Sequence, residues 1–147
     1  MKKFNFRLER VLKYKDQILD GLKNEHAKIL MDIRNKEEEI ARLERKYLEV
    51  CKDYNEEKFK GNLHIERILQ IEFYLESLDM QIKRENAVLD DLKLAEAKKR
   101  EEVVRAKQDV QSLEKLKENK IKEYNRELAA AGALVVEEFI SNRMVAL

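Results

Sequence analysis

The 147-residue chain is predicted to be all-α, with two long unequal helices forming an antiparallel coiled-coil hairpin. Apolar side chains recur in alternating steps of four and three residues, which is the spacing of a coiled-coil seam. The chain has no proline and only three glycines, so few residues can end a helix. Charged residues make up 41% of the composition, as is typical of long solvated helices.

The first helix is expected from about residue 5 to about residue 58, with Asn5 as its N-cap. Gly21 lies inside this helix, where glycine costs about 1 kcal/mol. Packing of the neighbouring Leu19 and Leu22 is expected to offset that cost. Only three seam residues of this helix are not apolar or aromatic. The seam consists of Leu8, Leu12, Lys15, Leu19, Leu22, His26, Ile29, Ile33, Lys36, Ile40, Leu43, Tyr47, Val50 and Tyr54.

The seam is interrupted after the first helix, and we place the reversal of the chain there. Residues 55–60 are polar except for Phe59, and Gly61 and Asn62 follow. Glycine can adopt the left-handed conformation that ends a helix, and asparagine can cap the next one. The turn is therefore expected at about 59–63, and His64 is expected to cap or begin the second helix.

The second helix is expected from about residue 63 to about residue 142. Its polar seam members, Glu85, Glu96 and Lys99, either set the register or lie at the edge of the contact. After Leu113, two consecutive steps of four predict a stutter, which locally unwinds a supercoil. The first part of the seam is Ile68, Ile71, Leu75, Leu78, Ile82, Glu85, Leu89, Leu92, Glu96, Lys99, Val103, Ala106, Val110 and Leu113. The second part is Lys117, Ile121, Tyr124, Leu128 and Ala131.

Pairing outward from the turn leaves the end of the second helix without a partner. The overshoot is about 20 residues, given the expected lengths of the two helices. It begins near Ala129 and contains the apolar residues Leu134, Val135, Val136, Phe139 and Ile140. Such an end is expected to fray, to dimerise or to enter another protein.

Composition excludes several classes of protein. The net charge is +1 and the signs alternate along the chain, so no field attracts nucleic acid or an anionic membrane. No run approaches the roughly 20 apolar residues of a membrane span, and the N-terminus does not look like a secretory signal. Cys51 is the single cysteine, so no internal disulfide can form. These features fit a soluble cytoplasmic protein.

No pattern of catalytic or metal-binding residues is evident. The three glycines are isolated, and neither His26 nor His64 belongs to a zinc-binding HExxH pattern. We interpret His26 as a packing residue of the seam. The carboxylates lie on solvated helix faces, without the desolvation that acid-base catalysis needs. We therefore expect no enzyme activity, no cofactor and no metal, although a reactive Cys51 thiol stays an alternative.

Aromatic residues gather near the expected turn. Phe73 and Tyr74 are adjacent, so they cannot both face a seam that already contains Ile71 and Leu75. At least one of them should be exposed, and exposed aromatics are favoured binding anchors. Packing in the seam is the alternative for Tyr47 and Tyr54. The cluster is Tyr47, Tyr54, Phe59, Phe73 and Tyr74.

The chain opens with Phe4-Asn5-Phe6-Arg7-Leu8-Glu9-Arg10-Val11-Leu12-Lys13. This stretch resembles the start of the flagellar export protein FliJ family. The closing Val135-Val136-Glu137-Glu138-Phe139 resembles its acidic and apolar C-terminal box. The resemblance covers nearly the whole chain. Its middle part rests on Gly61 followed by Leu69, Tyr74-Leu75, Leu78 and Ile82.

The resemblance implies a non-enzymatic component of the flagellar type III protein export apparatus. It implies a stalk that is cytoplasmic and lies peripherally at the inner face of the cell membrane. The long terminal region would enter the hexameric ring of the export ATPase, and the half near the turn would meet the export-gate membrane protein FlhA. Export chaperones are further implied partners.

The resemblance also implies residues for each contact. The ATPase-ring residues would be Leu134, Val135, Val136 and Phe139. The gate-binding surface would comprise Tyr54, Tyr74 and Leu78, with Tyr47 and Gln81 nearby.

Two other functions share this architecture. One is the coiled-coil stalk of a virulence type III secretion system, which genomic neighbours would distinguish. The other is a generic dimeric coiled-coil scaffold. Light scattering would separate a monomeric hairpin from an elongated dimer.

Overall fold

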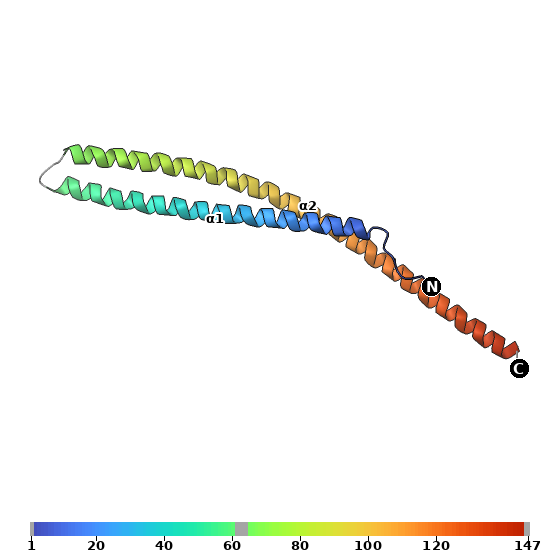
Figure 1. Ribbon diagram of the computed structural model, residues 1–147. Helices are drawn as coiled ribbons and strands as arrows, with labels where there is room; N and C mark the ends of the chain where they lie inside the picture. Colours follow the sequence, from blue (N-terminus) through green and yellow to red (C-terminus); the bar gives the residue numbers. More distant parts are fainter. Residues whose placement is uncertain (1, 61–64, 146–147) are drawn as a thin grey trace. The chain divides into compact units, whose positions relative to one another are not determined.

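The computed structural model describes residues 2–60 and 65–145, and it confirms an all-α hairpin of two helices. Helix α1 spans Glu9–Phe59 and helix α2 spans Ile65–Val145 (Figure 1). The described residues contain no strand. The expected break at Gly61-Asn62 and the expected role of His64 lie outside the described residues.

The chain divides into two compact units. The central unit is Leu22–Glu102, and the terminal unit combines Met1–Gly21 with Val103–Leu147. Each unit therefore contains part of α1 and part of α2. The expectation of one hairpin domain over residues 1–147 stays a prediction.

The predicted seam forms the core of both units. All its positions from Leu8 to Tyr54 are buried or half-buried, and so are all those from Ile68 to Leu113. Burial of apolar side chains along one stripe of each helix is the main stabilising term of such a fold. Nearly all of the buried core belongs to this seam, namely Leu12, Leu19, Ile40, Val50, Leu78, Leu89, Ala106 and Val110.

Ion pairs between the helices show that the pairing is antiparallel. In the central unit, Arg67 Nε lies 3.2 Å from Glu57 Oε1, while Lys99 Nζ lies 2.8 Å from Glu25 Oε2. Residue numbers thus fall along α1 as they rise along α2. The terminal unit has the same order, with Lys15 Nζ 3.6 Å from Asp109 Oδ2. Lys117 Nζ there lies 2.9 Å from Glu9 Oε2.

Four of the five polar seam residues of the central unit pair with one another across the helices. His26 Nε2 lies 3.0 Å from Glu96 Oε1, and Lys36 Nζ donates to Glu85 Oε2 at 2.6 Å. Hydrogen bonds to Glu85 and then to Glu39 raise the pKa of Lys36 above its ordinary value of 10.5. Of the two roles expected for polar seam residues, setting the register fits these contacts.

Helix α1 begins at Glu9, so the expected helix start at Asn5 is wrong. The amide of Leu12 donates to the carbonyl of Leu8 at 2.9 Å, which makes Leu8 the residue before the first helical turn. Residues 2–6 have no regular structure. In extended backbone, alternate side chains share a face, so Phe4 and Phe6 can both reach α2. A helix would point these two rings in different directions.

The predicted stutter region of α2 is only partly covered. Lys117, Tyr124 and Ala131 are half-buried, whereas Ile121 and Leu128 are exposed. Since α1 starts only at Glu9, irregular chain rather than a helix covers this part of α2. The irregular N-terminal segment covers one row of α2 side chains there, and the other predicted seam residues are exposed.

Candidate functional site

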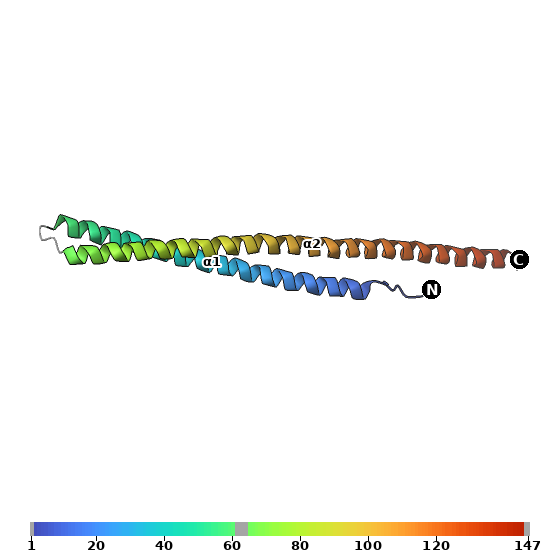
Figure 2. The same cartoon turned by 90° about the horizontal axis from the view of Figure 1, so that it is seen from above.

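The last part of α2 extends past the other described residues of the terminal unit (Figure 1). In Figures 1 and 2 the C-terminal end of α2 extends beyond the N-terminal segment with nothing drawn beside it. All of its large apolar side chains after Tyr124 are exposed. They are Leu128, Leu134, Val135, Val136, Phe139, Ile140, Met144 and Val145. We call residues 128–145 the overhang.

The four residues predicted to bind the ATPase ring all lie in the overhang. Leu134, Val135, Val136 and Phe139 are between 55% and 64% exposed. Three consecutive apolar residues on a helix with 3.6 residues per turn cover more than half of its circumference. Phe139 and Ile140 lie one turn further along, on the same sides. The overhang therefore presents apolar surface in several directions rather than along one stripe.

The aromatic residues near the turn differ in their surroundings. Tyr54 is half-buried, and its hydroxyl donates to Glu72 Oε1 at 2.7 Å. The ammonium of Lys58 lies 4.7 Å from the centre of the Tyr54 ring, within range of a cation–π interaction. Phe73 and Tyr74 are both exposed, as was expected of at least one of them. Tyr47 is half-buried in the seam.

The predicted gate-binding residues do not form one exposed surface. Tyr74 is 45% exposed and Gln81 is also exposed, whereas Leu78 is only 4% exposed. Leu78 occupies a seam position, so its side chain packs between the helices and is not available to a partner in this conformation. A role of Leu78 in binding would have to be indirect, through the position of α2. Its contact with the gate stays a prediction.

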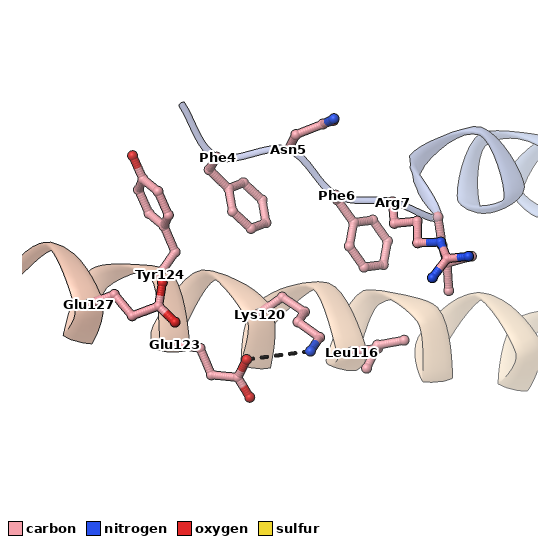
Figure 3. Close-up of a pocket in the computed structure, with 10 residues that line it drawn as sticks. Phe4, Asn5, Phe6, Arg7, Leu116, Lys120, Glu123, Tyr124 and Glu127 are labelled. Atoms are coloured by element: carbon pink, nitrogen blue, oxygen red, sulfur yellow. Dashed lines mark hydrogen bonds and ion pairs between the residues drawn. The ribbon is translucent and has the colours of Figure 1, made fainter. Parts of the chain in front are cut away.

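The N-terminal segment and α2 border an open cavity that the seam pattern does not predict. The cavity has a volume of about 540 Å³. Figure 3 shows Phe4 and Phe6 directed toward α2, with Phe4 next to Tyr124 and Phe6 above Leu116. The Phe4 and Tyr124 rings lie 5.7 Å apart, centre to centre, at 58°. The hydroxyl of Tyr124 donates to the carbonyl of Lys2 at 2.7 Å.

A sequence signal for this contact did exist. Phe4 and Phe6 alternate with Asn5 and Arg7, which is the period of extended chain and not of a helix. Four residues are too few to distinguish the two periods without knowing the partner surface. The cavity is lined by aromatic rings and by the ion pair of Lys120 with Glu123, which lies within α2. The ring contact of Phe4 with Tyr124 and the hydrogen bond of Tyr124 to Lys2 hold the N-terminal segment on α2.

The described residues hold no group of three histidine, cysteine or acidic side chains placed to bind a metal ion. His26 pairs with Glu96 in the seam, while Cys51 is half-buried. In the described parts of α1 and α2, no segment is apolar enough over a sufficient length to cross a membrane.

These features define a class of protein, an antiparallel two-helix coiled coil whose exposed side chains supply its candidate binding surfaces. Comparison with known families gives a closer assignment, because the family described as flagellar FliJ protein matches residues 4–144. The chain belongs to the FliJ family, and the resemblance drawn from its sequence is confirmed. Neither a curated protein nor a solved structure matches it.

Membership of this family indicates that the protein is a component of the flagellar export apparatus. The family is one of structural components rather than of known enzymes.

Proposed function

We propose that this protein is a non-enzymatic stalk of the flagellar type III export apparatus, which couples the export ATPase hexamer to the export gate. The overhang binds inside the ATPase ring, and the turn-proximal part of the central unit contacts FlhA. The observation that carries the proposal is the overhang, whose large apolar side chains are exposed although the seam positions up to Leu113 are buried or half-buried.

The distribution of apolar residues favours a partner that surrounds the overhang. A single partner helix would cover one stripe and leave part of Leu134, Val135 and Val136 in water. A ring of subunits can contact a helix from several sides at once. Glu137 and Glu138 interrupt the apolar surface, and cationic or polar groups lining the ring would be suitable partners for them.

The gate-binding surface is centred on the exposed side chains of Tyr74 and Gln81. Tyr54 adds a ring that is held by Glu72 and Lys58, so this aromatic contact is already ordered before a partner binds. Tyr47 supports the same region from the seam. Export chaperones are further partners, and the protein is cytoplasmic, reaching the inner face of the membrane only through its partners.

The ATPase activity of the cognate hexamer tests the ring contact. Full-length protein is expected to bind the hexamer and stimulate ATP hydrolysis. A chain truncated after Ala129 lacks all four ring-binding residues, so it should neither bind nor stimulate. Unchanged stimulation by the truncated chain would show that the overhang is not the ring-binding element.

A substitution in the full-length chain separates loss of contact from loss of length. Val135→Asp with Phe139→Asp keeps the helix and places charges among the apolar residues, which should weaken ring binding by more than tenfold. Leu48→Asp with Met31→Asp is a matched control, because these side chains are exposed on α1. The control is expected to stimulate as the unmodified protein does.

The gate contact is tested by a pull-down with FlhA. Tyr74→Ala with Gln81→Ala alters only exposed side chains, so binding should fall while helicity stays the same. Leu78→Ala removes core packing, and we expect it to lower the free energy of unfolding by about 2–3 kcal/mol. If the Tyr74 and Gln81 variant still binds FlhA fully, the gate surface lies elsewhere.

A further inference from the structure

The outer face of α2 in the central unit carries an apolar row that the seam does not use. Phe73, Met80, Ala87 and Leu94 recur every seven residues, each two positions after a seam residue. This position of a heptad points away from the partner helix and is ordinarily polar. Yet Phe73 is 78% exposed, Met80 58% and Leu94 71%. We call these four residues the outer row.

Charged residues flank the outer row on both sides of Ala87. The flanking residues before Ala87 are basic, and those at the same distances after it are acidic. Arg84 and Asp90 each lie three residues from Ala87, on opposite sides of it. Lys83 and Asp91 each lie four residues from Ala87. All four side chains are exposed. Both cations within four residues of Ala87 therefore have an acidic counterpart at the same distance in the other direction.

The same symmetry extends further along the helix. Met80 and Leu94 each lie seven residues from Ala87, and Glu76 and Lys98 each lie eleven residues from it. Met80 thus matches another apolar residue, and Glu76 matches a residue of opposite charge. Phe73 lies beyond this symmetric part, because the residue at the same distance on the other side of Ala87 is Glu101. A helix with this pattern is complementary to a second copy of itself running in the opposite direction.

We infer that the outer row is an interface between two copies of this chain, which pair antiparallel about a twofold axis at Ala87. The axis places Met80 of each copy against Leu94 of the other. It also places Lys83 and Arg84 opposite Asp91 and Asp90. Both copies use the same surface, as a closed twofold dimer requires. The small side chain of Ala87 lets the two helices approach closely where they cross.

The charge pattern favours antiparallel pairing of two copies over other arrangements. Parallel pairing in register would set each cation against the same cation of the second copy, which is destabilising.

A hollow of about 470 Å³ lies on this face between Phe73 and Met80, and Ser77 lines it. The second copy would present its small Ala97 and the stem of Lys98 toward that hollow. The present partner of Lys83 is Asp79 at 3.0 Å, an exposed pair that contributes little and is readily exchanged.

The size of the contact indicates a reversible dimer. From Glu76 to Lys98 the helix is roughly 33 Å long. One helix from each copy buries less than the roughly 1,200 Å² that marks a stable interface. A dissociation constant in roughly the micromolar range is expected. The charged flanks should make dimerisation weaker at high salt.

Sedimentation velocity with charge reversals tests the interface. The unmodified full-length chain is expected to shift from monomer to dimer as its concentration rises to about 100 µM. Lys83→Glu with Arg84→Glu makes both flanks acidic, and Asp90→Lys with Asp91→Lys makes both flanks basic. Each of these variants alone should dimerise at least tenfold more weakly. An equimolar mixture should dimerise, because the acidic flanks then meet the basic ones.

A matched pair of variants controls for general attraction between oppositely charged chains. These variants change the net charge by the same amounts as the outer-face variants, but at exposed positions of α1. One is Arg45→Glu with Lys46→Glu, and the other is Glu37→Lys with Glu38→Lys. A mixture of these two should form no additional dimer. Monomer at every concentration of the unmodified chain would overturn the inference. The inference would also be overturned if neither charge-reversal variant of the outer face weakened dimerisation. The copies would then pair through another surface, such as the overhang.

Cysteine cross-linking locates the axis. In a Cys51→Ser background, Ala87→Cys should form a disulfide with its own copy under mild oxidation. Met80→Cys should not, because two such residues would lie roughly 21 Å apart across the axis, while a disulfide requires Cα atoms within about 7 Å. A mixture of Met80→Cys and Leu94→Cys chains should cross-link. Equal self-cross-linking of the Ala87→Cys and Met80→Cys chains would contradict the twofold arrangement.

Discussion

At the scale of single residues, the polar members of the seam are the informative ones. His26, Lys36 and Lys99 interrupt the apolar pattern, and each has a carboxylate partner on the opposite helix. A partly buried ion pair adds little net stability, because desolvation offsets the attraction. It does penalise alternatives, since a shifted register leaves the charges without partners. We interpret these pairs as setting the alignment of α1 and α2.

High pH should weaken two of these pairs. The pKa values of Lys36 and Lys99 are both raised above 10.5 by hydrogen bonds, first to Glu85 and to Glu25 respectively. A raised pKa means that the folded state binds the proton more tightly, so the contribution is complete below pH 10.5 and is lost as the pH rises through the folded value.

Urea unfolding at several pH values measures this effect. The unmodified chain should be more stable than a Lys36→Met and Lys99→Met variant at neutral pH. The difference in the free energy of unfolding should shrink above pH 10.5, where the unmodified lysines lose their protons. The other ionisable groups are the same in both proteins, so their effect on stability cancels in the difference. A difference that stays constant through pH 10.5 would argue against charged pairs.

At the scale of elements, the start of α1 is decided by contacts and not by local sequence. Asn5 is a suitable N-cap, yet the helix begins four residues later. Phe6 is one of the buried residues of the chain, and Phe4 packs beside Tyr124. Extended backbone lets both rings reach α2, and this burial outweighs the helical hydrogen bonds that residues 5–8 would otherwise form.

Removing the Phe6 ring should release the N-terminal segment. Phe6→Ala is expected to speed tryptic cleavage after Lys3 and Arg7 severalfold, because local opening exposes these bonds. Tyr124→Phe loses only the exposed hydrogen bond to Lys2, so it should have a smaller effect. Mass spectrometry of the early fragments identifies the sites. Equal cleavage rates in all three proteins would show that the segment is already free of α2.

At the scale of the whole molecule, the unequal lengths of the helices determine which surfaces stay available. α1 has 51 residues and α2 has 81, so α1 cannot cover all of α2. The seam positions that α1 covers pack in the core, whereas those of the overhang are left to a partner. The outer row is available for a different reason, since it faces away from α1 throughout.

Truncation after Ala129 should leave the paired helices intact. The large apolar side chains that it removes are exposed, so the melting temperature should change by less than about 2 °C. The circular dichroism signal should fall only in proportion to the residues lost. A large drop in melting temperature would show that the overhang stabilises the fold and is not reserved for a partner.

The sequence by itself determined the two helices, the residues of their seam and the excess length of α2. These follow from periodicity, because burial on one stripe of a helix requires apolar residues at that spacing. Tertiary structure decided the pairing of His26 with Glu96 and of Lys36 with Glu85, as well as the extended path of Phe4 and Phe6. Such contacts join residues distant in the chain, and their energies depend on which surfaces meet.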